Sequence, residues 1–323
     1  MTRQEGLSYA AAGVDISAYE RMLGRVRPLI SATHGPEVVT GVGPFASLYR
    51  LPSGGCLAAT TDSVGTKVKV AIAFGRHRGI GHDIVNHCVN DLATTGATPL
   101  FFLDYFASGR LDEAVFSEVM TGLSEACREN GCALLGGETA EMPGVYALGD
   151  YDLVGFAIGQ VEPDVKRAPA RAGDLLVGLP AAGLHTNGFS LARKVFEDVP
   201  LDHVFPDLGR PLGEVLLEPH RSYLGDLQSL TWKSAAHITG GGLLGNVPRA
   251  LPEGLAAELD RSAWSVPPIF ELIERLGHVA SDEMLGTFNM GLGMVLVTDQ
   301  PLPGLPVVGR VLEQAGSHRI RVK

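Results

Sequence analysis

The chain has 323 residues, of which 45% are hydrophobic and 19% are charged, and its formal net charge is -10 at pH 7. This length and composition predict a globular protein with two domains. The acidic balance excludes a general nucleic-acid binder, which needs a basic face to release counterions. No apolar run approaches the roughly 18 residues of a membrane span, and the start lacks a signal-peptide core, so we expect a cytoplasmic protein without a membrane partner.

The first predicted element is an amphipathic helix, which we expect to pack against the rest of the protein like an ordinary structural element. Asp15 can cap it, and its apolar stripe comprises Ile16, Tyr19, Leu23, Val26 and Ile30. The stretch GVGPFA at 41–46 then fits a GxGxxA dinucleotide fingerprint. Residues 45–51 alternate like a strand, however, and do not open a helix, so we reject a Rossmann unit.

The stretch TTDSVGTKVKV at 60–70 predicts a turn that binds phosphate and a metal ion. Asp62 follows a predicted strand at 56–61 and could hold a hard cation through oxygen. Gly65 lets the backbone approach an anion, and Lys67 supplies a positive charge beside it. The alternative is an ordinary polar turn between two strands.

A helix is predicted over 83–95, with Ile84, Cys88 and Leu92 on one face and Asp91 beside them. An acid at such a position needs a partner. It is either a carboxylate hydrogen-bonded to a neighbouring loop or a second metal ligand near Asp62. A strand over 99–107 and an amphipathic helix over 111–130 follow.

The stretch CALLGGETAEMPGVY at 132–146 predicts a short buried strand followed by a glycine-rich loop that carries Glu138 and Glu141. Two carboxylates this close repel each other unless a cation or a shared proton separates them. This favours a magnesium site over a solvated loop. One more strand is predicted over 152–159.

Residues 161–173 are rich in proline and charge, and we place a domain boundary there. A strand over 174–180 then leads into a loop with His185 and Asn187, and a helix begins at 190. Strand, glycine-rich loop and helix N-terminus together predict a phosphate site. His185 is either a phosphate contact or proton shuttle, or a buried structural residue.

A strand over 236–239 repeats this arrangement, because Gly240, Gly241 and Gly242 follow it and a helix extends through 246. This loop suits a sugar phosphate, or is a tight turn without a ligand. In the strand predicted over 288–298, Asn289 is the side chain able to contact a polar ligand. The chain closes with two short strands.

No Walker A, HExxH, GxSxG or zinc-type Cys/His motif occurs in the sequence. The common nucleotide, protease and esterase machineries are therefore not indicated. The sequence does contain acidic or glycine-rich turns in its first half and two glycine-rich loops suited to phosphate in its second half. Together these predict binding of a magnesium nucleotide and of a second phosphorylated ligand.

Seven segments closely resemble the aminoimidazole ribonucleotide synthetase family. They are SYAAAGVDI (8–16), TTDSVGTK (60–67), CVNDLATTGATPLFFLDYFASGRL (88–111), GGETAEMPGVY (136–146), GLHTNGFSL (183–191), AHITGGGLLGNVPRALP (236–252) and FNMGLGM (288–294). The resemblance extends nearly from end to end. The chain departs from the family at Ser63, where glycine is usual, and after Thr298, where a helix is usual.

The resemblance implies a two-domain α/β (α+β) protein. The N-terminal domain (1–165) is expected to bind ATP and to pair with its copy in a homodimer, where sheets of the two subunits form an intersubunit β-barrel. The C-terminal domain (166–323) is expected to be an α/β sandwich that completes the substrate and phosphate site.

The implied reaction is the ATP-dependent cyclisation of formylglycinamidine ribonucleotide to aminoimidazole ribonucleotide, with release of ADP and phosphate, in de novo purine biosynthesis. The γ-phosphate is expected to convert the formyl amide oxygen into an iminophosphate. The amidine nitrogen then attacks that carbon and phosphate leaves. Catalysis of this kind depends mostly on positioning and charge neutralisation.

The resemblance also implies roles for individual residues. The expected Mg²⁺ ligands are Asp62, Asp91 and Glu138, with Glu141 a weaker candidate. The expected ATP contacts are Asp62, Gly65, Thr66, Lys67, Asp91, Glu138 and Asn187. The expected catalytic residues are His185, Asn187 and Lys67. The expected substrate contacts are Gly240, Gly241, Gly242 and Asn289.

Other ATP-dependent enzymes of the same fold family are alternatives, above all thiamin-monophosphate kinase. Selenophosphate synthetase needs a reactive cysteine near its N-terminus, and no cysteine precedes Cys56. Formylglycinamidine ribonucleotide synthetase is usually far longer or split. A non-catalytic dimeric nucleotide sensor would keep the glycine loops but could dispense with Glu138 and His185.

Overall fold

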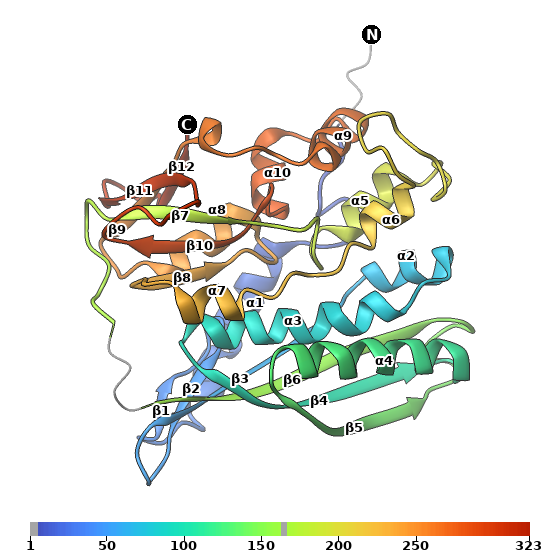
Figure 1. Cartoon of the computed structure of the whole chain (residues 1–323), viewed down its shortest axis with the longest axis horizontal. Helices are drawn as coiled ribbons and strands as arrows, with labels where there is room; N and C mark the ends of the chain where they lie inside the picture. The colour runs from blue at the N-terminus through green and yellow to red at the C-terminus, as the bar shows by residue number, and fades with distance from the viewer. Residues whose placement is uncertain (1–5, 163–166) are drawn as a thin grey trace.

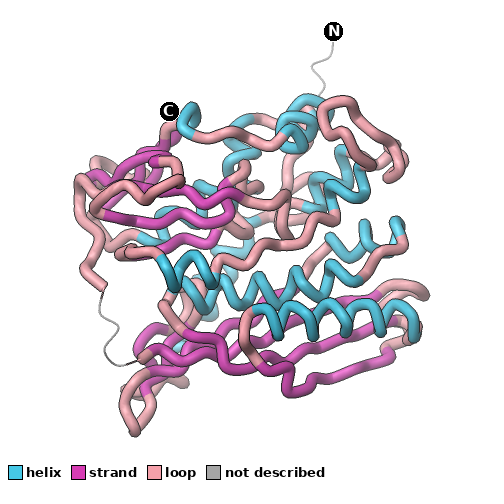
Figure 2. Tube along the Cα trace, in the orientation of Figure 1, coloured by secondary structure: helices cyan, strands magenta, loops and turns pink. Residues whose placement is uncertain are grey.

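The computed structural model describes residues 6–162 and 167–323, and it contains two six-stranded sheets with helices between them (Figures 1 and 2). The prediction of a two-domain α/β protein is confirmed. The predicted boundary between residues 165 and 166 lies outside the described residues. Within the described ranges, no helix is both long and apolar enough to cross a membrane.

The N-terminal sheet has the order β1-β2-β3-β6-β4-β5, and only β4 and β5 are parallel neighbours. Its strands are β1 (Val38–Thr40), β2 (Ser47–Arg50), β3 (Cys56–Ser63), β4 (Thr98–Ser108), β5 (Ala133–Glu141) and β6 (Tyr151–Val161). The helices of this half are α1 (Ile16–Ser31), α2 (Lys67–Phe74), α3 (Arg78–Thr94) and α4 (Glu113–Glu129). Figure 1 shows α3 and α4 over one face of this sheet.

The C-terminal sheet has the order β12-β9-β11-β7-β10-β8, antiparallel except between β12 and β9. Its strands are β7 (Leu175–Pro180), β8 (Ser234–His237), β9 (Leu255–Leu259), β10 (Leu292–Thr298), β11 (Val307–Glu313) and β12 (Ile320–Val322). Its α-helices are α5 (Phe189–Val195), α6 (Leu212–Leu216), α7 (Leu224–Ser229), α8 (Gly242–Asn246), α9 (Pro268–Gly277) and α10 (Ser281–Thr287). Short 3₁₀ turns cover Val247–Ala250 and Arg261–Ala263.

Helix α1 begins where the sequence predicts, because the carboxylate of Asp15 accepts a hydrogen bond from the backbone N–H of Ala18 at 2.8 Å. Its apolar stripe is not packed as expected. Tyr19 is 59% exposed and Val26 is 43% exposed. The periodicity therefore identified the helix correctly, whereas the burial of its apolar face was wrong within this single chain.

The glutamates of residues 136–141 lie on a strand, so the predicted loop there is wrong. Strand β5 continues through Glu141, and its parallel register pairs Glu138 with Tyr105 and Glu141 with Ser108. Successive side chains on a strand alternate between faces, so two residues three apart point to opposite sides of the sheet. The two carboxylates therefore do not share one site in this chain.

Helix α3 lies between the N-terminal sheet and the C-terminal domain, as Figure 1 shows. Its apolar side, with Ile84, Cys88 and Leu92, is fully buried in the N-terminal core. It approaches α4 closely, because a Cβ atom on Gly122 would lie 1.9 Å from the carbonyl oxygen of Arg78. Covered on both sides, α3 is the element that connects the two halves of the molecule.

Candidate functional site

A stripe of buried polar side chains lies along α3. Asp83 is followed at i+3, i+4, i+7 and i+8 by Asn86, His87, Asn90 and Asp91, so all five share one side of the helix. All five are buried. This polar stripe faces the C-terminal domain, since its hydrogen-bond partners come largely from there.

The polar stripe binds the backbone of residues 220–223. Asp83 accepts a hydrogen bond from the N–H of His220 at 2.7 Å, and Asn86 donates to the carbonyl oxygen of His220 at 2.7 Å. Asn90 donates to the carbonyl oxygen of Arg221 at 2.8 Å and accepts from the N–H of Tyr223 at 2.7 Å. Helix side chains thus take the place of water for a buried loop.

Lys67 is fully buried, and its ammonium group contacts Asp83 at the start of the polar stripe. Nζ lies 2.9 Å and 2.8 Å from the two carboxylate oxygens and 2.8 Å from the carbonyl oxygen of Glu218. The ammonium group donates hydrogen bonds to Oδ1 of Asp83 and to the Glu218 carbonyl, and its contact with Oδ2 is an ion pair. The ammonium group of Lys67 therefore lies in the interface between the domains and not at the predicted phosphate-binding turn.

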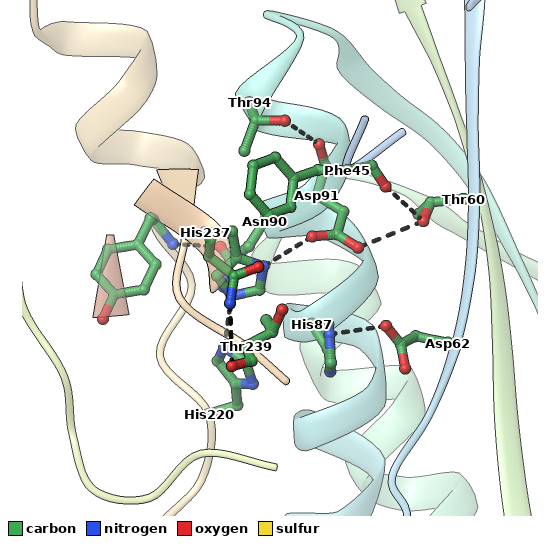
Figure 3. Close-up of polar contacts among 12 residues, drawn as sticks. Phe45, Thr60, Asp62, His87, Asn90, Asp91, Thr94, His220, His237 and Thr239 are labelled. Carbon is green, nitrogen blue, oxygen red and sulfur yellow. Dashed lines mark hydrogen bonds and ion pairs between the residues drawn. The ribbon is translucent and has the colours of Figure 1, made fainter. Parts of the chain in front are cut away.

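Two carboxylates are each paired with a buried imidazole at this interface (Figure 3). Nε2 of His87 lies 2.9 Å from Oδ2 of Asp62, and Nδ1 of His237 donates to Oδ1 of Asp91 at 2.8 Å. Thr60 lies 3.4 Å from the second oxygen of Asp91. The structure thus places Asp62 of β3 and Asp91 of α3 in one cluster, as the sequence predicts, although with histidines between them.

The ring nitrogens on the far sides of these histidines also have partners. Nδ1 of His87 lies 2.9 Å from the hydroxyl of Thr186, and Nε2 of His237 lies 3.0 Å from Nε2 of His220. Burial lowers the pKa of both His220 and His237 well below the usual value, so both are neutral. Since Nδ1 of His237 donates to Asp91, its Nε2 accepts the hydrogen bond from His220.

Charge is distributed unevenly over the cluster. Burial lowers the pKa of His87, but the neighbouring charge of Asp62 outweighs it and raises that pKa to about 9. Burial raises the pKa of Asp91 to about 7, against the opposing charge of His87. Burial also raises the pKa of Asp62, but His87 outweighs it and the net shift is downward. His87 and Asp62 therefore form the charged pair at neutral pH.

The loop before α5 brings two of its side chains to the cluster and buries a third. Thr186 contacts His87, and Asn187 donates to the hydroxyl of Thr186 at 3.3 Å. His185 is fully buried, stacks on His220 with ring centroids 4.0 Å apart, and accepts from the N–H of Ala182 at 3.1 Å. Its contacts in this chain are those of a packed residue.

The glycine loop after β8 lies beside Asn187, because a Cβ atom on Gly240 would be 3.3 Å from the Asn187 side-chain oxygen. Gly241 and Gly242 both have positive φ, at 94° and 57°. The side chain of Asn246 donates to the carbonyl oxygens of Thr239, Gly240 and Gly242 and fixes the loop. Two predicted phosphate loops are thereby brought together.

Three predicted site residues lie elsewhere. Glu138 and Glu141 are exposed on β5, separated from β3 by β4 and β6, and Glu141 accepts from the N–H of Leu111 at 2.8 Å. Asn289 is buried, donates to the carbonyl oxygen of Gly183 at 2.9 Å and accepts from the N–H of Gly291 at 2.8 Å. The contacts of Asn289 are those of a turn-stabilising residue.

Thr66 lines a cavity of about 670 Å³ between α2 and α5, and Gly65 precedes it in the chain. Gly65 has a positive φ of 67°, and the hydroxyl of Thr66 lies 3.1 Å from that of Ser190. The cavity is also lined by Lys69, Arg193 and Lys194. Ser63 continues β3 opposite Val154, so the family's usual glycine at this position is not needed for the turn.

The cluster contains residues that the sequence reasoning missed, namely His87, Thr186, His220, His237 and Arg249. Arg249 stacks on Phe45, 3.8 Å from its ring centroid, and its charge acts on Asp91. One signal was present in the sequence: His87 and Asp91 are four apart on a predicted helix and therefore share a face. Thr186, His237 and Arg249 lie within the segments 183–191 and 236–252 that carry the family resemblance, whereas His220 lies in none of the quoted segments.

The donor set decides which cation could fit. Mg²⁺ requires oxygen ligands in near-octahedral geometry. Asp62, whose side chain is 37% exposed, offers such oxygens at the edge of the cluster. His87, Asp91 and His237 have ligand atoms within 4.8 Å of one another, but two of the three offer nitrogen. The buried part of the cluster therefore does not fit Mg²⁺.

Two family models match this chain. Residues 43–161 match the model of the AIR synthase related protein, N-terminal domain, and residues 171–304 match that of the C-terminal domain. The chain belongs to the AIR synthase-related family. A phosphoribosylformylglycinamidine cyclo-ligase of Myxococcus xanthus is 52% identical over 90% of this chain and 88% of its own length. Another, of Desulfitobacterium hafniense, is 47% identical over 90% of this chain and 89% of its own length.

Solved structures that resemble this AIR synthase-related chain are more distant in sequence. A thiamine-monophosphate kinase from Stenotrophomonas maltophilia aligns with a TM-score of 0.62 at 18% identity, over 94% of this chain and 95% of the other. The hydrogenase maturation protein HypE in complex with ATP gives a TM-score of 0.62 at 18% identity, over 96% and 92%. At such identities the likeness shows the fold alone.

The buried Lys67–Asp83 pair predicts a specific pattern of stability changes. Lys67→Met leaves the Asp83 charge buried without its cation and should lower the free energy of unfolding by about 3–5 kcal/mol. Lys67→Met combined with Asp83→Asn removes both charges while keeping an acceptor for His220, and should restore most of that loss. Urea denaturation measures both.

The matched control is Lys194→Met, which breaks an exposed ion pair with Glu197 and should change the free energy by less than about 1 kcal/mol. A similar small change for Lys67→Met would contradict the inference that its buried ion pair stabilises the interface.

Proposed function

We infer that this chain catalyses the ATP-dependent ring closure of formylglycinamidine ribonucleotide to aminoimidazole ribonucleotide in purine biosynthesis. The observation that carries this inference is the 52% identity to a phosphoribosylformylglycinamidine cyclo-ligase over 90% of the chain. The products are ADP and phosphate. A thiamin-monophosphate kinase activity is disfavoured, because that likeness is one of fold at 18% identity.

The site residues are assigned as part of the same proposal. Asp62 is the best placed of the three predicted Mg²⁺ ligands, since it is half-exposed whereas Asp91 is buried and Glu138 lies on β5. Gly65 and Thr66 contact ATP phosphates where Thr66 lines the α2–α5 cavity, whose lining includes the cations Lys69, Arg193 and Lys194 and one acid, Glu197. A phosphoryl group with several negative charges is stabilised by such a combination of amides and cations.

Asn187 and the glycines at 240–242 form the other half of the proposed site, where the ribosyl phosphate binds. Support comes from their proximity, since the side-chain oxygen of Asn187 lies against Gly240. Lys67 and His185 act as positioning residues beneath this site, which accords with their buried contacts. The hydrogen bonds of Asn289 to Gly183 and Gly291 favour a positioning role for Asn289 as well. Cytoplasmic location stays a prediction from the sequence.

The reaction is tested by incubating the purified chain with ATP, Mg²⁺ and either formylglycinamidine ribonucleotide or thiamin monophosphate. Phosphate release together with the aminoimidazole product is expected only with the first substrate. Asp62→Asn should lower kcat/KM by about 100-fold or more, the scale of removing one preorganised charge contact.

The control for Asp62→Asn is Asp207→Asn, an exposed aspartate paired with Arg275, which should leave turnover unchanged. Phosphorylation of thiamin monophosphate without any ring product would overturn the assignment of the reaction. Unchanged activity in Asp62→Asn would remove Asp62 from the site.

We also propose the homodimer, with the open face of the N-terminal sheet as its interface and an intersubunit barrel as its form. Phe156 on β6 is 40% exposed on this face, where it pairs with Thr61 and Leu103. Among the described helices, those drawn over this sheet in Figure 1 lie on its other face. An exposed apolar sheet face is a common dimer interface.

Phe156→Glu should convert the dimer to a monomer, because it places a charge in the centre of the apolar face. Light scattering after gel filtration measures the mass. Leu276→Glu on α9 is the control, since Leu276 is 41% exposed on a different domain and should not change the mass. A monomeric unsubstituted chain, or a dimeric Phe156→Glu variant, would contradict the proposed interface.

A further inference from the structure

Two cysteines meet at the turn between α4 and β5. Cys127 lies in the last turn of α4, and Cys132 directly precedes β5. Both are free thiols, and they are 2% and 8% exposed. From the contact between them we propose that Cys127 and Cys132 are a reversible oxidation site, at which hydrogen peroxide converts the two thiols into a disulfide. The site is separate from the proposed ring closure and does not depend on it.

The end of helix α4 brings the two thiols together. Gly131 has a positive φ of 66°, which lets the chain reverse after the helix. The N–H of Cys132 donates to the carbonyl oxygen of Cys127 at 2.9 Å, and the N–H of Gly131 donates to that of Arg128 at 3.2 Å. This pair of hydrogen bonds is the Schellman motif, in which the side chains at its two ends frequently touch. Here those side chains are two thiols, and they form a hydrogen bond with each other.

The hydrogen bond between the thiols makes the two sulfur atoms unequal. It lowers the pKa of Cys132 below its usual value, although burial opposes this shift. The same hydrogen bond, together with burial, raises the pKa of Cys127. The thiolate is the reactive form of a cysteine. Cys132 is therefore the sulfur that reacts first, and Cys127 is the partner that forms the disulfide with it.

The turn lies where a small oxidant can reach it. Strand β5 is the edge strand of the N-terminal sheet (Figure 1), and Gly131 and Ala133 on either side of Cys132 are exposed. A Cβ atom on Gly131 would meet no other atom within 4 Å. Cys88, in contrast, is fully buried under α3, where its thiol lies 3.7 Å from the carbonyl oxygen of Gly155. We therefore expect Cys88 to stay reduced.

The oxidation balances with hydrogen peroxide as the only co-reactant. The thiolate of Cys132 attacks one peroxide oxygen, the O–O bond breaks, and the other oxygen leaves as water after taking up a proton. The sulfur of Cys127 then attacks the sulfenic acid on Cys132. The S–O bond breaks, and a second water leaves with the thiol proton of Cys127. The two thiols thus lose two electrons and two protons, and a dithiol reductant reverses the step.

The disulfide would enclose a residue of the interface between the domains. Asn130 lies between the two cysteines, and its side chain donates to Oδ1 of Asn86 at 2.8 Å and accepts from the hydroxyl of Ser222 at 2.6 Å. A disulfide that fits the native turn restricts the unfolded chain and leaves these hydrogen bonds in place. The oxidised protein should therefore melt at a higher temperature than the reduced protein.

The test treats the reduced full chain with a small excess of hydrogen peroxide, removes the peroxide and counts free thiols after denaturation. The count should fall from four to two, and dithiothreitol should restore it. The intact mass should fall by about 2 Da, the mass of the two hydrogens lost, and peptide mapping should place the bond between Cys127 and Cys132. The melting temperature is measured before and after oxidation.

Cys56→Ser is the matched control, since Cys56 lies outside the turn and this variant should form the disulfide as the unsubstituted chain does. Cys132→Ser should form no disulfide. Cys127→Ser should form none either, but should accumulate a sulfenic acid on Cys132 that dimedone labels. Four free thiols in the peroxide-treated unsubstituted chain, or a disulfide to Cys56 or Cys88, would overturn the proposal even if the variants fail to fold. A melting temperature that does not rise would overturn the fit of the disulfide to the native turn.

Discussion

The buried hydrogen bonds between α3 and the backbone of residues 220–223 are the interaction on which the rest of the structure depends. Asp83, Asn86 and Asn90 each form at least one hydrogen bond with this backbone across the interface. A buried polar group that loses its partner costs about 1–3 kcal/mol, so sliding or opening this interface is unfavourable at several points at once. The two domains are consequently held in one relative position.

This fixed position accounts for the location of the site. Asp62 and Asp91 belong to the N-terminal domain, whereas Thr186 and His237 belong to the C-terminal domain, and the interface brings all four together. Ring closure driven by ATP depends mainly on holding two phosphorylated molecules in register. A rigid contact between the domains would hold the two molecules in this way without a dedicated acid or base.

Much of the fold could be predicted from local patterns, because strand alternation, the cap at Asp15 and glycine turns are encoded over a few residues. The polar stripe of α3 could not, since a polar helix face normally indicates solvent, and only the tertiary structure shows a second domain covering it. The glutamates of β5 were placed in a loop because Gly136 and Gly137 suggested flexibility, whereas pairing with β4 extends the strand. Asp62 and Asp91 were found, but their histidine partners come from segments far apart in sequence.

The central claim is that polar contacts through α3 make the two domains one cooperative unit. Differential scanning calorimetry of the full chain tests it most directly, by comparing the calorimetric enthalpy of unfolding with the van't Hoff enthalpy. The account predicts a single transition in which the two enthalpies agree, and the same single transition at a lower temperature for Asn90→Ala. Two separate transitions in the unsubstituted chain, one for each domain, would contradict it.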